Sequence, residues 1–361
     1  MRVELIAFTA RGYELALRLA HGLGDAGEEA RAAKGFGPDR VPLGSWTAGA
    51  FRAADALVYV GATGIAVRAI APHAASKASD PAVVVLDEGG RWSIPVLSGH
   101  LGGANDLARR LAAMCGARAV VTTATDGRGV WAADDWARRH GMAVRGAGAI
   151  KAVSGALLAH EPVALASAVP ITGALPAGLR RVPAPEPGAC PDAGGLPCCL
   201  ISPFAHDARA ARDGAGASET APAPSRVLQL VPRCVVAGIG CRRGVGAEAI
   251  AQAVDEALAA ARVLPEALAA LASIDIKRDE PGLRAYAARA GLPVSFHAAE
   301  ELAGVAGSVS PSAFVKRTVG VDNVCERSAL SAGGTLIAPK RARDGVTVAL
   351  ALAPVAYDLN D

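Results

Sequence analysis

Two patterns of hydrophobic and polar positions alternate over residues 1–145. Short apolar runs such as Val83-Val84-Val85-Leu86 are typical of parallel strands that are covered on both faces. Between them lie segments such as 104–114, in which apolar residues recur every three or four positions, as on one face of a helix. The predicted strands are 3–9, 56–60, 82–87, 94–97 and 119–123, and the predicted helices are 13–23, 65–71, 104–114 and 134–139.

The pattern weakens after this region and then returns. Residues 146–204 show a helix at 150–159 followed by short strands, and we treat them as a middle region. Residues 205–226 are almost all Ala, Gly, Pro, Ser, Asp and Arg, a composition that buries little apolar surface and predicts a disordered linker. Residues 227–361 show strands at 234–239, 270–274, 294–296, 335–338 and 346–351, with a helix at 247–260.

These elements predict the α/β class. We expect two α/β lobes with mainly parallel sheets, joined by a small middle region and a flexible linker. The expected domains are 1–145, 146–204, 205–226 and 227–361. A chain of 361 residues agrees with more than one domain, because a single core seldom grows beyond about 250–300 residues.

Composition excludes several classes of function. A net charge of +3 and 4% aromatic residues argue against nucleic-acid binding, which needs a clustered basic face or stacking rings. The longest uncharged run, 162–179, is broken by prolines and glycines and is a poor membrane span. The seven cysteines show no C-x-x-C spacing, so we expect no metal site, no disulfide framework and a cytoplasmic location.

Four apolar strands run into glycine-rich loops that open helices, at 61–64, 99–103, 238–244 and 320–326. Glycine allows a ligand close to the backbone, and the free N–H groups of a helix start favour an anion. A single loop of this kind is more often an ordinary tight turn. Four together favour a ligand with several anionic groups.

The motifs around these loops resemble the cobalt-precorrin-5A hydrolase family. GATGIAVR at 61–68, LSGHLGGAND at 97–106 and TTATD at 122–126 look like its N-terminal domain. GIGCRRG at 238–244, SIDIKRDEPGL at 273–283 and VGVDNVCE at 319–326 look like its C-terminal domain. The match covers nearly the whole chain except the linker and the middle region.

The resemblance implies an enzyme of oxygen-independent cobalamin synthesis. Such an enzyme opens a δ-lactone on a cobalt-bound tetrapyrrole and releases acetaldehyde, giving cobalt-precorrin-5B. The cobalt arrives with the substrate, so no cofactor and no metal site of the protein are expected. The implied partner is the small-molecule tetrapyrrole, with no nucleic acid and no membrane; transient contact with other enzymes of the pathway is also allowed.

Three residues are the candidates for catalysis. His100 stands between glycines at a predicted strand end, where open α/β sheets place ligands, and is expected to take a proton from water and return it later. Its alternative roles are to cap a helix or to bind a substrate carboxylate. Asp126 could orient an imidazole or water, and Glu326 stands in a first helical turn; both have ordinary capping roles as alternatives.

A larger set is predicted to bind the carboxylates of the substrate through loop glycines, polar side chains and cations. The backbone N–H groups of Gly102 and Gly103 are in addition expected to stabilise an oxyanion. The candidates are Gly61, Thr63, Gly64, Arg68, Ser98, Gly102, Gly103, Asn105, Gly240, Arg242, Arg243, Lys277 and Asn323.

Three alternatives stay open. Cys241 and Cys325 lie at helix starts, where a thiolate nucleophile would be stabilised. The chain could instead be a non-catalytic corrinoid-binding module, which acetaldehyde release would distinguish. A nucleotide-dependent α/β enzyme is the third alternative, although no Gly-x-Gly-x-x-Gly with a following acidic residue and no Walker lysine is present.

Overall fold

The structure, a computed structural model, describes residues 1–76, 79–206, 226–307 and 323–361. The chain forms two compact units, Met1–Arg138 and Arg139–Asp361. The predicted linker at 205–226 lies outside the described residues except at its ends. Among the described residues, no helix is both long and apolar enough to cross a membrane.

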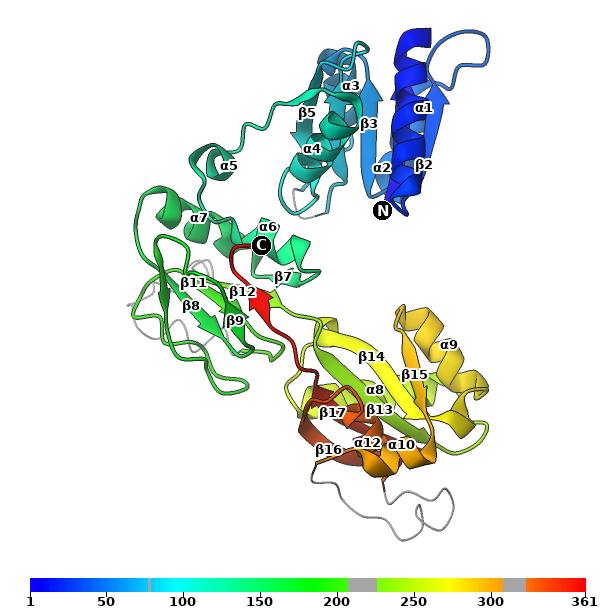
Figure 1. Ribbon diagram of the computed structural model, residues 1–361, viewed down its shortest axis with the longest axis vertical. Coiled ribbons are helices and arrows are strands. Elements are labelled where there is room, and N and C mark those ends of the chain that lie inside the picture. Colours follow the sequence, from blue (N-terminus) through cyan, green and yellow to red (C-terminus); the bar gives the residue numbers. More distant parts are fainter. Residues whose placement is uncertain (77–78, 207–225, 308–322) are drawn as a thin grey trace. The chain divides into compact units, whose positions relative to one another are not determined.

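The N-terminal unit contains a six-stranded sheet in the order β2-β1-β3-β4-β5-β6 (Figure 1). Its strands are β1 (Arg2–Ala7), β2 (Glu29–Lys34), β3 (Ala56–Val60), β4 (Ala82–Leu86), β5 (Trp92–Leu97) and β6 (Arg118–Ala119). Its helices are α1 (Ala10–Asp25), α2 (Leu43–Ala53), α3 (Thr63–Ile70), α4 (Ala104–Cys115), α5 (Ala124–Arg128) and α6 (Ala133–Arg139), the last of which ends at the boundary of the unit. The sequence pattern missed β2, whose apolar residues are all alanine, and the helices α2 and α5.

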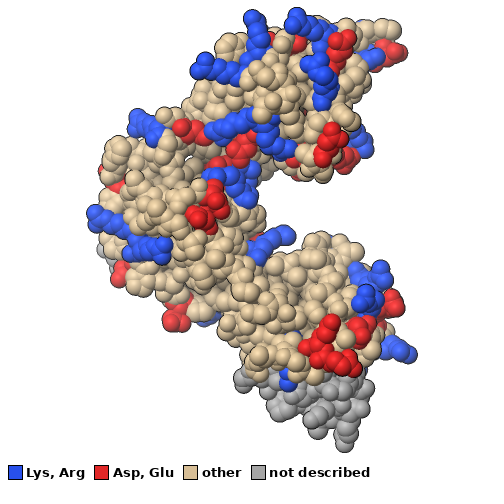
Figure 2. Space-filling view, in the orientation of Figure 1, with Lys and Arg blue, Asp and Glu red and all other residues tan. Residues whose placement is uncertain are grey.

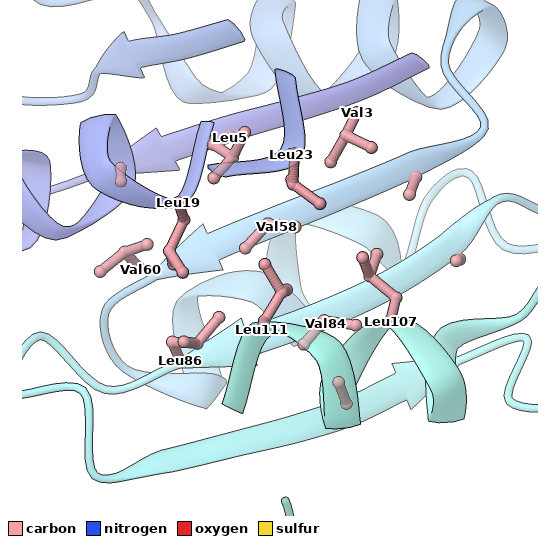
Figure 3. Close-up of a cluster of buried hydrophobic side chains, with 14 of the residues drawn as sticks. Val3, Leu5, Leu19, Leu23, Val58, Val60, Val84, Leu86, Leu107 and Leu111 are labelled. Atoms are coloured by element: carbon pink, nitrogen blue, oxygen red, sulfur yellow. The ribbon is translucent and has the colours of Figure 1, made fainter. Parts of the chain in front are cut away.

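Helices cover both faces of this sheet. Leu19 and Leu23 of α1 and Leu107 and Leu111 of α4 pack on one face, against side chains of β1, β3 and β4 (Figure 3). Alternate strand residues point to the other face, where Tyr59 packs with residues of α2 and α3. Because both faces are buried, the strands read as continuous apolar runs.

Two strands of this sheet, β5 and β6, run opposite to the other four, which are parallel to one another as predicted. β5 is antiparallel to β4, with Leu86 opposite Ser93 and Val83 opposite Leu97. The connection between them is a short turn in which Asp87 accepts the N–H groups of Arg91 and Trp92. A turn of this length forms a hairpin and is too short for the crossover that a parallel pair needs. The end of β5 therefore lies at the amino-terminal edge of β4.

The second unit contains two five-stranded sheets and a small strand pair. The middle sheet has the order β10-β8-β11-β12-β7, and the C-terminal sheet has the order β15-β14-β13-β17-β16. The middle strands are β7 (Ala143–Arg145), β8 (Val163–Ser167), β10 (Leu179–Arg181), β11 (Cys198–Ile201) and β12 (Val227–Val231), with α7 (Ile150–Leu158) and the 3-10 turn η1 (Ala147–Ala149). The small pair is β9 (Ile171–Thr172) with β18 (Tyr357–Asp358).

These pairings shift two expected boundaries. β7 was placed in the first domain and β12 in the last, yet the two strands pair antiparallel in the middle sheet. β12 also pairs parallel with β11, and the two flank the segment 207–225. The middle sheet is therefore closed by strands from both ends of its sequence, which a linear division of the chain could not foresee.

The C-terminal sheet is built on the parallel strands β13, β14 and β15, with β17 antiparallel to β13 and β16 antiparallel to β17. The strands are β13 (Val235–Cys241), β14 (Leu268–Ile274), β15 (Val294–His297), β16 (Thr335–Arg343) and β17 (Val346–Leu352). The helices are α8 (Ala247–Ala260), α9 (Pro281–Ala290), α10 (Ala299–Gly304) and α12 (Val324–Leu330), with the 3-10 turns η3 (Pro265–Ala267) and η4 (Asp275–Lys277). The predicted α/β class with mainly parallel sheets is confirmed.

Candidate active site

The loop between β5 and α4 is a tight turn built by its glycines. Gly103 has φ +81°, and its N–H donates to the carbonyl of His100 at 2.9 Å. A Cβ on Gly102 would overlap the Cβ of Ser98, so only glycine fits there. Because the Gly103 N–H is already bonded inside the turn, the predicted oxyanion role of this group is wrong for the folded loop.

Ser98 is the unusual residue of this loop. Its φ is +55°, a conformation that is rare outside glycine, and the residue is only 8% exposed. Its hydroxyl has no hydrogen-bond partner among the described residues. Backbone strain and an unsatisfied buried hydroxyl both occur at ligand sites, so Ser98 keeps its place among the candidate substrate contacts.

The imidazole of His100 lies between two carboxylates. Its Nε2 is 3.0 Å from Oδ2 of Asp126 and 3.2 Å from the Thr125 hydroxyl. Its Nδ1 is 3.6 Å from Oδ1 of Asp134, an ion-pair contact that is longer than a hydrogen bond. Asp134, opposed by burial and aided by Asp126, raises the pKa of His100 to about 9. His100 is therefore an imidazolium at neutral pH and a poor acceptor for a proton from water.

Asp126 binds His100 and three further side chains. Asn105 donates to its Oδ2 at 3.0 Å, and Thr123 and Arg109 also donate to this carboxylate. Burial opposes its ionisation, but hydrogen bonds from Thr123, His100 and Arg109 outweigh burial and hold the pKa of Asp126 well below its usual range. The structure thus brings His100, Asn105 and Asp126 together, with Asp126 placed to orient the imidazole.

The carboxylates around His100 belong to a larger ion network. Arg109 bonds Asp106 at 3.0 Å, and Arg138 bonds Asp106 and Asp135. Three cations (His100, Arg109 and Arg138) face four carboxylates (Asp106, Asp126, Asp134 and Asp135), a net charge of −1. Figure 2 likewise shows acidic and basic side chains interspersed on the N-terminal unit. Within this network, Asp126 and Asp134 favour a protonated His100, and the net negative charge disfavours capture of anions.

The sequence did not single out Asp134. It stands 34 positions after His100 in a helix whose Asp134-Asp135 pair reads as ordinary first-turn acids. Helix α6 begins next to this pair, and Asp134 is 3% exposed. Only folding shows that one of the two acids faces an imidazole.

The glycine loop after β3 lies at the other edge of the same sheet. Gly61, Thr63 and Gly64 follow the carboxyl end of β3, whereas His100 follows the end of the antiparallel β5. The five residues of β3 separate the two edges by roughly 17 Å. Arg68 donates to the Gly64 carbonyl at 3.2 Å. His100 therefore follows a strand end, as predicted, but this end lies at the edge of the sheet opposite to the 61–64 loop because β5 reverses direction.

The C-terminal unit gathers several predicted cations at one sheet edge. β13 and β14 are parallel, so the loops that carry Arg242-Arg243 and Lys277 leave the same edge. Glu280 joins these loops: it accepts the Gly244 N–H at 2.6 Å and the Lys277 ammonium at 3.1 Å. Arg242 and Arg243 are exposed. Gly240, in β13, packs against Thr347.

Asn323 and Glu326 form hydrogen bonds that fix the start of α12 in the second unit. The Asn323 side chain accepts the Glu326 N–H at 3.0 Å as the N-cap of the helix. Glu326 is fully buried and accepts the Lys340 N–H at 2.7 Å. These contacts support the capping and structural alternatives for both residues. Burial also raises the pKa of Cys325 to about 11 and that of Cys241 in the same direction, which disfavours a thiolate nucleophile.

No group of three His, Cys, Asp or Glu residues in the described ranges is placed to hold a metal ion. All seven cysteines are free thiols.

Comparisons with known proteins match three successive regions of the chain. Family descriptions match in order: "Cobalamin synthesis G N-terminal" at 45–126, "Cobalamin biosynthesis central region" at 131–212 and "Cobalamin synthesis G C-terminus" at 235–351. A cobalt-precorrin-5A hydrolase of Salmonella typhimurium is 36% identical over 358 residues, which is 97% of each chain. The chain belongs to the cobalt-precorrin-5A hydrolase family.

Two further relatives extend the comparison. The cobalt-precorrin-5A hydrolase of Priestia megaterium is 31% identical over 311 residues, covering 85% of this chain and 80% of that protein. A solved cobalamin biosynthesis protein G homologue from Sulfolobus solfataricus is 21% identical and covers 97% of both chains, with a TM-score of 0.40. The central-region match at 131–212 includes β7, β8, β10 and β11 of the middle sheet.

Proposed function

We propose that this protein hydrolyses cobalt-precorrin-5A, opening its δ-lactone and releasing acetaldehyde to give cobalt-precorrin-5B. The observation that carries the proposal is the 36% identity to a cobalt-precorrin-5A hydrolase over 97% of both chains. Coverage of this extent argues against a separate binding module, because all three regions of the relative are retained. The cobalt enters with the substrate, and the protein supplies no metal of its own.

The residues around His100 supply the proton transfers in this proposal. The oxygen of water bonds to the lactone carbonyl carbon, and both protons of that water pass to solvent as a carboxylate forms. The acyl C–O bond breaks, and the leaving alkoxide takes a proton from the His100 imidazolium. The neutral imidazole then accepts the proton of the new alcohol as the C–C bond breaks. Acetaldehyde leaves, and the electron pair of that bond stays on the macrocycle.

Binding of the carboxylates falls to other loops. The network around His100 carries a net negative charge, whereas Arg242 and Arg243 are exposed cations beside Gly244. Guanidinium groups bind carboxylates in a bidentate manner, which suits the acetate and propionate arms of a tetrapyrrole. We place the reaction in the reducing cytoplasm, which agrees with seven free thiols.

The test is anaerobic incubation with cobalt-precorrin-5A followed by an acetaldehyde assay. His100→Gln keeps a hydrogen-bonding side chain but cannot titrate, and turnover should fall by about 10²–10⁴. His21→Gln is the matched control, because His21 has an 83% exposed side chain on α1. Binding of the substrate without acetaldehyde release by the wild type would instead favour a corrinoid carrier. Near-normal turnover of His100→Gln would limit His100 to positioning.

A further inference from the structure

Asp134 is a buried carboxylate that faces the side of His100 opposite to Asp126. The residue is 3% exposed, and its Oδ1 lies 3.6 Å from Nδ1 of His100. This oxygen has no hydrogen-bond partner among the described residues. Burial opposes the ionisation of Asp134, but the neighbouring His100, aided by the backbone at the start of α6, holds the pKa of Asp134 below its usual value.

We propose that Asp134 is a positioning residue that keeps His100 protonated, so that the imidazole first gives a proton and only then takes one. The inference rests on the proposed function for the identity of the reaction, but the state of His100 that it assigns is independent of that reaction. It reverses the order expected from the sequence, in which His100 begins as a base.

The charges around His100 support this assignment from every side. Asp126 on α5 faces Nε2, Asp134 on α6 faces Nδ1, and Thr125 contributes only a neutral hydroxyl. The two arginines of the network form their ion pairs with carboxylates other than Asp134. Arg109 pairs with Asp106 and Asp126, and Arg138 pairs with Asp106 and Asp135. Among the residues that the structure describes, His100 is the one cation that contacts Asp134. A buried carboxylate without a counter-ion is costly, so the protonated imidazole is the form that the site stabilises.

The assignment has a chemical consequence. An imidazolium can protonate the departing lactone oxygen, the step in which a good leaving group is needed. The imidazole left behind has a carboxylate on each side, which makes it a stronger base than a free histidine. It is then suited to remove the proton of the alcohol, and this transfer restores the imidazolium. The two carboxylates therefore serve both half-reactions without titrating themselves.

The experiment compares Asp134→Asn with Asp135→Asn. Asp135 is the matched control, because it is the next residue on the same helix and pairs with Arg138 instead of His100. The imidazole of His100 is titrated by NMR in protein with ¹⁵N-labelled histidine, and its signals are assigned by their loss in His100→Gln. We expect a wild-type pKa of about 9, an unchanged value in Asp135→Asn, and a value lowered by about 1–3 units in Asp134→Asn.

A second readout is the pH dependence of acetaldehyde release. The rate of acetaldehyde release should decline at a lower pH in Asp134→Asn than in the wild type, and at the wild-type pH in Asp135→Asn. Asp134→Glu should return the decline to the wild-type pH, because it returns the carboxylate charge. If Asp134→Asn does not fold, titration of the wild type and of Asp134→Glu still decides. Equal His100 titration in both asparagine variants, or an ordinary wild-type value near 6.5, would overturn the proposal. Absence of acetaldehyde from the wild type would count against the proposed function alone, since the titration requires no substrate.

Discussion

Replacing His100 with glutamine should make the stability of the N-terminal unit much less sensitive to alkaline pH. The folded protein raises the pKa of His100 from 6.5 to about 9, chiefly through Asp134 and then Asp126. A raised pKa contributes stability that is fully present below pH 6.5 and is lost as the pH rises through 9. At about 1.4 kcal/mol for each pKa unit, the imidazolium contributes about 3 kcal/mol at low pH. The His100 side chain is only 18% exposed, so solvent screening reduces this contribution to stability only slightly.

Tryptophan fluorescence isolates the relevant transition. All four tryptophans lie in the N-terminal unit, at positions 46, 92, 131 and 136, so their emission reports its unfolding and not that of the second unit. The melting temperature of the wild type should fall by on the order of 10 °C between about pH 6 and about pH 9.5, given roughly 3–5 °C per kcal/mol for a unit of this size.

The variants decide the cause of this fall. His100→Gln should lose the His100 part of the pH dependence, and His21→Gln, on the exposed face of α1, should keep it. The range stays well above the pKa values of Asp126 and Asp134, which are lowered in the folded protein, so these carboxylates do not contribute. Parallel melting curves for the wild type and His100→Gln across this range would refute the reasoning.

Three other predictions concern the second unit. Gly238→Ala should destabilise it by about 3 kcal/mol or more in denaturant unfolding, because a Cβ there would overlap the backbone of Cys325 in α12. The control Gly155→Ala, at an exposed helical position, should cost no stability, and equal unfolding midpoints of the two variants would contradict the close packing at Gly238. Replacing both Arg242 and Arg243 with alanine should weaken tetrapyrrole binding, followed by its visible spectrum, with little change in melting temperature; unchanged affinity would give these exposed arginines a surface role only. Glu326→Gln should lower stability but retain turnover per folded molecule, since Glu326 is buried and accepts the Lys340 N–H. A stable variant whose turnover falls by about 10²–10⁴ would instead indicate that Glu326 is catalytic.

Local patterns were sufficient for most strands and helices near the site. The buried run at 82–86 and the amphipathic helix at 104–115 are found close to their predicted bounds, since each depends on the spacing of apolar residues within one segment. The direction of β5 could also have been predicted from the sequence. Asp87-Glu88-Gly89-Gly90 is a turn signal between two apolar runs, and reading it as a hairpin would have moved His100 to the correct edge.

By itself the sequence determined the α/β class, the family, and the loop that carries His100, because these depend on periodicity and on motifs contiguous in the chain. Tertiary structure alone decided the ionic state of that histidine. Asp126 and Asp134 reach it across 26 and 34 positions, from two short helices with no distinctive spacing. Protonation depends on distance and burial, which arise only when separate segments pack together. The same packing turned Glu326 from a candidate acid into a buried support of α12.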